Sequence, residues 1–531
     1  MSTLTGTTHL LRLIARVDRI RLTVWALVLG FVPVGVASSF ASLYETEASR
    51  QGLVATIASS PGLVALLGPI NGTSIGALTA WRVGTIGAVL VALMAAFTII
   101  RHTRLEEETG RRELLGSTVL GRHAPVFAAA LMTLTTGVII GALLVGGLIG
   151  LGESASSAVA FGLSWSLIAT VFAAVGALAA QLTESAGGAR AIAGGAVGLF
   201  FALRLAGDGG EENGVGWLSW LSPIGWVNKL EPYGEERWWV IALFIAIALL
   251  IGSVALALSS QRDVGAGYFP PRPGPGTAAR DLSSPIGLAW RLHRGAVIGW
   301  SIGIALFATI WGGLADTVGE LFEDNPQLAE IFEAMGGAGT LTDIFFAAAM
   351  GIVALIVSAY AIDAALTLRS EEDGLRAEPI LATPTPRLRW ATSHVLFAVV
   401  VPIFIMTLAG VTAGLTYGTI SGEIARQIGD LVQAALLQVP AIWVAGGVAV
   451  ALYGLAPRRT SLSWAALVGF LLVGQLGQIL QFPQWVLNLS PFTHIPAPPE
   501  PVTFVPLLAL TAIAALLVGI GLIGFGRRDV L

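Results

Sequence analysis

The feature of this sequence that most limits its fold is a series of apolar runs of about 20 residues, each long enough to cross a bilayer as a helix. Six such runs lie near 22–42, 83–100, 124–150, 157–181, 191–206 and 238–259, and six more lie near 296–315, 344–366, 391–417, 431–455, 462–481 and 504–525. Only 12% of the residues are charged, about half the ~25% typical of soluble domains. The sequence therefore predicts an all-α polytopic membrane protein with 12 transmembrane helices.

A short charged stretch after the second run recurs after the eighth. Adding 265 to the positions of six charged residues in the first copy gives their counterparts in the second. The matched pairs are Glu106 and Glu371, Glu107 and Glu372, Glu108 and Asp373, Arg111 and Arg376, Glu113 and Glu378, and Arg122 and Arg387. We therefore expect a tandem duplication. An even number of spans in each copy gives two parallel six-helix repeats.

Other repeated features mark the limits of each copy. Leu-Ser-Pro recurs at 221–223 and 489–491, and Arg-Asp-Val recurs at 262–264 and 528–530. Residues 59–70 and 324–335 both read as short amphipathic helices that begin at a proline.

The domain boundaries follow from these limits. We expect a first six-span unit at 1–260, a Pro/Gly-rich cytosolic linker at 261–284 and a second six-span unit at 285–531. The linker contains YFPPRPGPG, which excludes a span or a stable helix.

The helix predicted over 10–20 has two different faces. The apolar face carries Leu10, Leu13, Ile14 and Val17, and the basic face carries Arg12, Arg16 and Arg19. This pattern is typical of a helix that lies in the membrane interface.

The distribution of basic residues predicts the orientation. If both termini are cytoplasmic, only six of the 29 Lys and Arg residues lie at or beyond the outer border, as the positive-inside rule requires. These six are Arg50, Arg82, Arg204, Lys229, Arg237 and Arg426.

Several classes of chemistry are excluded. The chain has no cysteine and no paired histidine motif, so we expect no metal site, and it has no basic block for nucleic acid. The only lysine, Lys229, follows no glycine-rich loop, so the chain has no phosphate-binding loop of its own. No histidine and carboxylate constellation lies near a nucleophilic serine in the sequence, so no catalytic residue is predicted. Asp363 is the clearest ionisable residue within a span, and its role stays open.

Two interpretations of the charged loops remain. They could be solvated connectors, or they could dock on a partner. The apolar residues that follow the acids favour docking, because they would otherwise be exposed. They are Leu114, Leu115, Val119 and Leu120 in the first copy and Ile380 and Leu381 in the second.

The loop EEETGRRELLGSTVLGR and its copy EEDGLRAEPILATPTPRLRW, each between the second and third spans of a unit, resemble those of ABC-2-type permeases of actinobacterial antibiotic exporters, the exporter of polyketide antibiotics or tetronasin-resistance type. The resemblance covers essentially the whole chain. It implies a type V-like ABC exporter in a bacterial plasma membrane, with two copies of a separately encoded ATPase that hold ATP and Mg.

The resemblance also implies that the interfacial helix and the two charged loops contact the ATPase. The implied coupling residues are Glu106, Glu107, Glu108, Arg111, Glu113, Glu371, Glu372, Asp373, Arg376 and Glu378. The second copy departs from the first at Pro379, which shortens or kinks its helix.

An amphiphilic drug or antibiotic is the expected substrate, because the spans offer apolar and aromatic groups but few charges. The candidate cavity residues are Phe97, Phe200, Phe201, Phe470, Gln475 and Gln478. The alternatives are a proton-coupled secondary drug exporter of the major facilitator kind, and an ABC exporter of lipid or polysaccharide.

Overall fold

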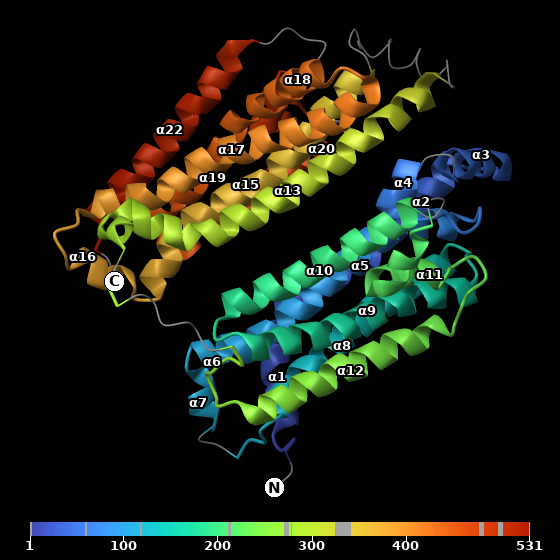
Figure 1. Ribbon diagram of the computed structural model, residues 1–531, viewed down its shortest axis with the longest axis horizontal. Coiled ribbons are helices and arrows are strands. Elements are labelled where there is room, and N and C mark those ends of the chain that lie inside the picture. The colour runs from blue at the N-terminus through green and yellow to red at the C-terminus, as the bar shows by residue number, and fades with distance from the viewer. Residues whose placement is uncertain are drawn as a thin grey trace. The chain divides into compact units, whose positions relative to one another are not determined.

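The computed structural model describes residues 3–58, 61–116, 119–210, 214–269, 276–277, 279–323, 341–476, 483–496 and 503–529. Every regular element within these ranges is a helix, which confirms the all-α prediction. The chain divides into two compact units, Met1–Pro273 and Gly274–Leu531 (Figure 1). The division falls inside the stretch 261–284 that the sequence indicates as a linker.

In its described residues, unit 1 has six helices that are long and apolar enough to cross a membrane. They are α2 (Arg19–Leu43), α5 (Ile75–Ile100), α8 (Ala124–Gly150), α9 (Ala155–Leu182), α10 (Ala186–Gly209) and α12 (Val240–Gln261). Shorter helices are α1 (Thr7–Val17), α3 (Glu47–Ala58), α4 (Pro61–Leu67), α6 (Glu106–Glu108), α7 (Arg111–Gly116) and α11 (Pro223–Lys229). The predicted short helix at 59–70 is therefore present as α4, whereas α3 was not predicted.

Unit 2 has five such spans in its described residues. They are α13 (Pro285–Glu323), α15 (Leu341–Asp373), α17 (Arg387–Ser421), α18 (Ile424–Leu437) joined to α19 (Val439–Leu455), and α22 (Phe504–Arg527). The prediction of 12 spans is thus confirmed for 11. The remaining one, 462–481, begins as the apolar helix α20 (Leu462–Leu476), and its end lies outside the described residues, as does the helix predicted at 324–335.

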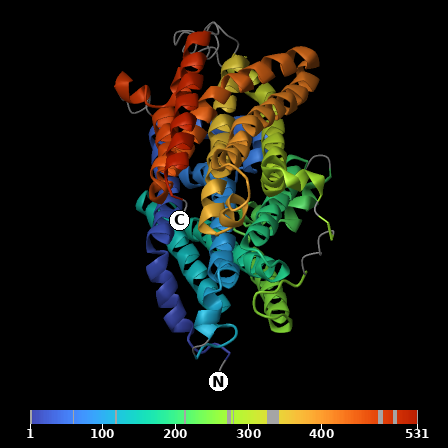
Figure 2. The same ribbon diagram turned by 90° about the vertical axis from the view of Figure 1, so that its left-hand side faces the viewer.

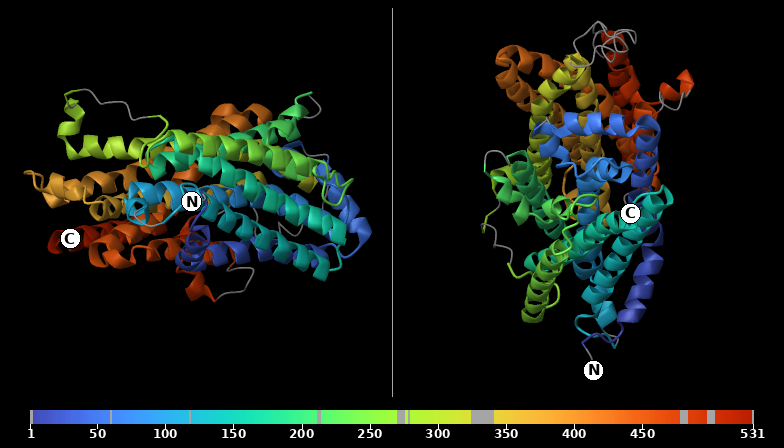
Figure 3. Two further views of the ribbon diagram at one scale, coloured as in Figure 1. Left: turned by 90° about the horizontal axis from the view of Figure 1, so that it is seen from below. Right: turned by 90° about the vertical axis from the view of Figure 1, so that its right-hand side faces the viewer.

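The core of unit 1 lies between α5 and α9. Phe161, Trp165 and Phe172 of α9 are almost fully buried, and the indole Nε1 of Trp165 donates a hydrogen bond to the Gly84 carbonyl of α5 at 3.2 Å. Helices α2 and α12 lie at the edges of the unit (Figure 2, Figure 3) and keep much of their apolar surface exposed, as helices facing lipid do.

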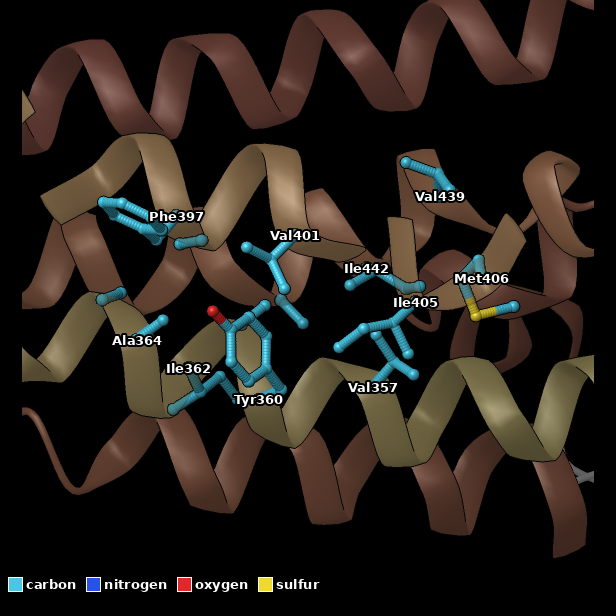
Figure 4. Close-up of a cluster of buried hydrophobic side chains, with 14 of the residues drawn as sticks. Val357, Tyr360, Ile362, Ala364, Phe397, Val401, Ile405, Met406, Val439 and Ile442 are labelled. Carbon is cyan, nitrogen blue, oxygen red and sulfur yellow. The ribbon is translucent and has the colours of Figure 1, made fainter. Parts of the chain in front are cut away.

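Unit 2 buries α15 against α17 and α19. Figure 4 shows Val357 and Tyr360 of α15 directed toward Val401 and Ile405 of α17. The order of packing follows that of unit 1. Helices α2 and α8, α5 and α9, and α9 and α12 pack together in unit 1, as α13 and α17, α15 and α19, and α19 and α22 do in unit 2.

Glycines let the backbones of neighbouring helices approach each other. Gly141 of α8 faces Gly162 of α9, and Gly454 of α19 faces Gly521 of α22, so a Cβ at any of these positions would collide with a facing carbonyl. Small residues at such crossings are characteristic of membrane helix packing.

The repeated Leu-Ser-Pro makes the same contact in each unit. The hydroxyl of Ser222 donates a hydrogen bond to the Phe200 carbonyl at 2.6 Å, and the hydroxyl of Ser490 donates one to the Phe470 carbonyl at 3.3 Å. Both serines are buried, and both tie the short segment before the sixth span of the unit to the preceding apolar helix.

Candidate functional site

The first charged loop is built on an extension of α5. The helix continues as one π-helical turn, Arg101–Leu105, and then as α6. Gly110 ends this helix with a φ of 71°, a conformation that favours glycine, and the chain turns into α7. In unit 2 the matched residue is Leu375, which adopts a φ of 56° without being glycine. Wider π-helical turns are frequent at functional sites.

Glu107 lies at the centre of this loop and is buried. Its carboxylate pairs with Arg104 at 3.0 Å and with Arg112. The guanidinium of Arg262, just after α12, donates two hydrogen bonds to this carboxylate, of 3.0 and 3.1 Å. A carboxylate with three guanidinium partners is well compensated for the loss of water. Burial and the neighbouring cations, Arg262 first among them, lower the pKa of Arg112 to about 10.

Arg104 joins the loop to two other helix ends. Its fully buried guanidinium donates to the carbonyls of Ala180 at the end of α9 (2.8 Å), Gly265 (3.3 Å) and Ala266 (3.0 Å), both after α12. Arg262 adds a bond of 2.7 Å to the side chain of Gln181. The ends of α5, α9 and α12 are therefore held together by one buried polar cluster.

Unit 2 contains the matching ion pair. The guanidinium of Arg528, just after α22, donates to the two carboxylate oxygens of Glu372 at 2.9 and 2.6 Å. Glu372 is only 7% exposed, and Arg528 also lies over the ring of Tyr453, 4.8 Å from its centre. Glu372 is the counterpart of Glu107, and Arg528 begins the second Arg-Asp-Val as Arg262 begins the first.

Two further contacts recur at matched positions. Arg111 pairs with Glu106 at 3.2 Å, and Arg376 pairs with Glu371 at 3.0 Å. Arg122 donates to the Arg262 carbonyl, and Arg387 donates to the Arg528 carbonyl, each at 3.1 Å.

A cavity of about 650 Å³ opens between α1 and the first charged loop. Its apolar wall consists of Leu10, Leu13, Ile14, Val17, Leu105, Leu120, Pro125 and Val264. Its polar rim includes Arg101, His102, Glu106, Arg111, Arg112, Glu113 and Arg122. We call this cavity the α1 groove. Leu13 and Val17 are 45% and 59% exposed, so the groove presents apolar surface without cover in this unit.

Asp18 separates α1 from α2. Its backbone, at φ −100° and ψ 13°, interrupts the helix between Val17 and Arg19. The buried carboxylate pairs with Arg101 at 3.1 Å and with His102 at 2.8 Å. Helix α13 of unit 2 runs without a break from Pro285, so the described part of unit 2 has no separate helix that corresponds to α1.

Comparison with known proteins identifies the family. A family model described as the C-terminal domain of the multidrug efflux system permease Rv1217c matches residues 282–526. Over 529 residues, the chain is 41% identical to the multidrug efflux system permease protein Rv1217c of Mycobacterium tuberculosis (strain ATCC 25618 / H37Rv). The alignment covers 99% of this chain and 95% of that protein. The chain belongs to the Rv1217c permease family. The alignment with the Rv1217c permease includes both units and both charged loops.

The structure places the remaining predicted coupling residues of this Rv1217c-family chain at the loop surfaces. Glu108 accepts a hydrogen bond of 2.8 Å from the Ala186 N–H at the start of α10, and Asp373 pairs with Arg369 at 2.7 Å. Glu113 and Glu378 are exposed. The basic residues Arg12, Arg16 and Arg19 are exposed and do not line the α1 groove.

The predicted cavity residues do not form one site in the described structure. Phe97, Phe200 and Phe201 are half-buried against packed helices of unit 1, and the ring of Phe200 contacts that of Phe172 at 6.0 Å. Phe470 packs against the core of unit 2. The side chain of Gln475 and the whole of Gln478 lie outside the described residues.

A second buried charged cluster, which sequence reasoning missed, lies at the opposite end of unit 1. Arg204 and Asp208 on α10 pair at 2.7 Å, and neither side chain is exposed. Ser219 and Asn228 donate to Asp208 at 2.5 and 3.3 Å, and Arg204 also donates to the carbonyls of Ala65 and Leu66. The sequence did contain a signal for this pair, because opposite charges four residues apart lie on the same face of a helix.

Proposed function

We propose that this chain is the membrane-spanning permease of an ATP-driven multidrug efflux system, and that it works with a separately encoded ABC ATPase. The relationship to the Rv1217c permease carries the proposal, because it extends over nearly the whole of both proteins. The sequence has no Gly-Lys-Ser/Thr loop, so ATP and Mg would be bound by the partner subunits.

The α1 groove is the proposed contact for one ATPase subunit. Its composition supports this, because an apolar centre within a charged rim is the usual anatomy of a protein interface. The exposed Leu13 and Val17 would provide the centre, and the exposed Arg111 and Glu113 would provide charged contacts. The loop of unit 2 would contact the second subunit through Glu371, Asp373, Arg376 and Glu378.

The two units are proposed to be parallel six-span repeats of a type V-like ABC exporter. Support comes from contacts at matched positions, namely the pairs Glu107–Arg262 and Glu372–Arg528 and the hydroxyl bonds of Ser222 and Ser490. Two unrelated sequences would not be expected to place the same contacts at nearly the same offset. The transported compound is proposed to be amphiphilic, as the apolar spans suggest.

Stoichiometry tests the docking model. We expect the purified chain alone to hydrolyse no ATP and the complex with its ATPase to contain one permease chain and two ATPase subunits. Native mass measurement of the complex gives the ratio directly. Two permease chains per ATPase pair would contradict the assignment of one docking loop to each unit.

Topology is a separate expectation. Both termini should be cytosolic, with 43–82, 207–237, 317–342 and 482–503 outside, because of the arginine asymmetry. Single cysteines can be introduced into this cysteine-free chain and labelled with an impermeant reagent in intact cells. We expect labelling of Gln51→Cys and none of Ser283→Cys, and the reverse result would overturn the orientation.

A further inference from the structure

We propose that Arg262 and Arg528 are positioning residues that make each charged loop and the end of the sixth span of its unit move as one body. This inference rests on the proposed function, because the loops are taken to be the elements that the ATPase displaces. It assigns a role in transport to two arginines outside the loops themselves.

The first observation is the repetition of the pair. Glu107 with Arg262 and Glu372 with Arg528 form two-bonded ion pairs with N–O distances between 2.6 and 3.1 Å. The residues Glu107 and Glu372 are 8% and 7% exposed. Such planar pairs fix relative orientation as well as distance, which a single bond to a flexible side chain does not do.

The second observation is that each sixth span packs mainly against one neighbouring helix of its unit. Helix α12 packs chiefly along α9, and α22 packs chiefly along α19. Both are among the least buried of the candidate spans. The direct links from the loops to the ends of these spans include the ion pairs, and Arg122 and Arg387, which bind the carbonyls of Arg262 and Arg528. In unit 1, Arg104 adds bonds to the carbonyls of Gly265 and Ala266.

The third observation connects this link to the α1 groove. Arg122 and Val264 line the groove beside Glu106 and Arg111. An ATPase segment seated there would touch the loop and the end of α12 together. Displacement of the loop would then shift the sixth span of unit 1, and the matched pair would do the same in unit 2.

The test uses unit 2, where Arg528 is the one arginine that pairs with Glu372 among the residues that the structure describes. In the reconstituted permease–ATPase complex, Arg528→Ala and Arg528→Lys are compared with the charge exchange Glu372→Arg with Arg528→Glu. Lysine keeps the charge but not the two-bonded geometry. Arg426→Ala, which removes an exposed pair with Glu423, is the matched control.

We expect Arg528→Ala and Arg528→Lys to bind the ATPase within about threefold of the wild type and to hydrolyse ATP, while substrate transported per ATP falls at least tenfold. The charge exchange should restore at least a third of the loss, and the control should match the wild type. Unchanged transport per ATP in both single variants would refute the proposal that the loop and the end of α22 move as one body. A charge exchange that restores no transport would refute it as well.

A second readout works without the ATPase. Spin labels on cysteines at the exposed positions Glu378 and Arg527 report the distance between the loop and the end of α22. We expect the distance distribution to broaden in Arg528→Ala and to narrow again in the charge exchange. Failure of the wild type to bind an ATPase would refute the proposed function. An unchanged distance distribution in Arg528→Ala would refute only the proposed link between the loop and α22.

Discussion

Replacing Leu13 with aspartate is expected to weaken attachment of the ATPase by about two orders of magnitude while the permease remains in the membrane. Leu13 is 45% exposed and lines the α1 groove, so the folded permease alone loses little when it is changed. A bound partner would bury the new carboxylate in the apolar wall of the groove, which includes Leu10 and Leu120. An unsatisfied buried charge costs about 3 kcal/mol or more, roughly a 150-fold increase in Kd.

Ala15→Asp is the matched control, because Ala15 is exposed on the same helix but does not line the groove. Binding of the purified ATPase to the permease in detergent measures both variants. Equal binding by Leu13→Asp and the wild type would exclude the groove as the docking surface.

Glu107 is a poor choice for the same test. Its carboxylate is already occupied by three arginines, so Glu107→Ala would leave Arg104 buried and short of a partner. Loss of binding could then reflect a disturbed loop. Glu106→Ala and Glu113→Ala alter exposed or half-exposed groups at the rim, and any weakening of ATPase binding in them reports on docking.

Asp208→Ala is expected to be among the most destabilising single changes in unit 1. It leaves the fully buried guanidinium of Arg204 without its carboxylate, and removing one partner of a buried pair costs about 3–5 kcal/mol. The hydroxyl of Ser219 and the amide of Asn228 also lose an acceptor. We expect a large fall in the apparent Tm of the purified permease in detergent.

The double change Arg204→Leu with Asp208→Leu separates charge from packing. Because replacing a buried ion pair with apolar side chains is often neutral, the double variant should recover much of the Tm lost by Asp208→Ala. Glu423→Ala, at an exposed pair, should leave the Tm unchanged. A Tm within a few degrees of the wild type in Asp208→Ala would show that Arg204 is compensated by its backbone partners.

The sequence alone determined the class of fold, eleven candidate spans and the helix α1. The apolar runs predicted eleven helices that the structure describes as candidate spans, because in lipid the backbone of such a run must satisfy its own hydrogen bonds. The alternation of apolar and basic residues likewise predicted α1, which depends only on local periodicity. The charged loops were located by their offset, without knowledge of any contact.

Only the tertiary structure decided which charges meet. Arg262 lies 155 positions after Glu107, and Arg528 lies 156 positions after Glu372, so neither local spacing nor composition selects these partners among 29 cationic residues. The repeated Arg-Asp-Val was visible in the sequence, but only as a mark of where each unit ends. An ion pair forms where packing brings helix ends together and removes water, and that depends on the arrangement of α5, α9 and α12 as a whole.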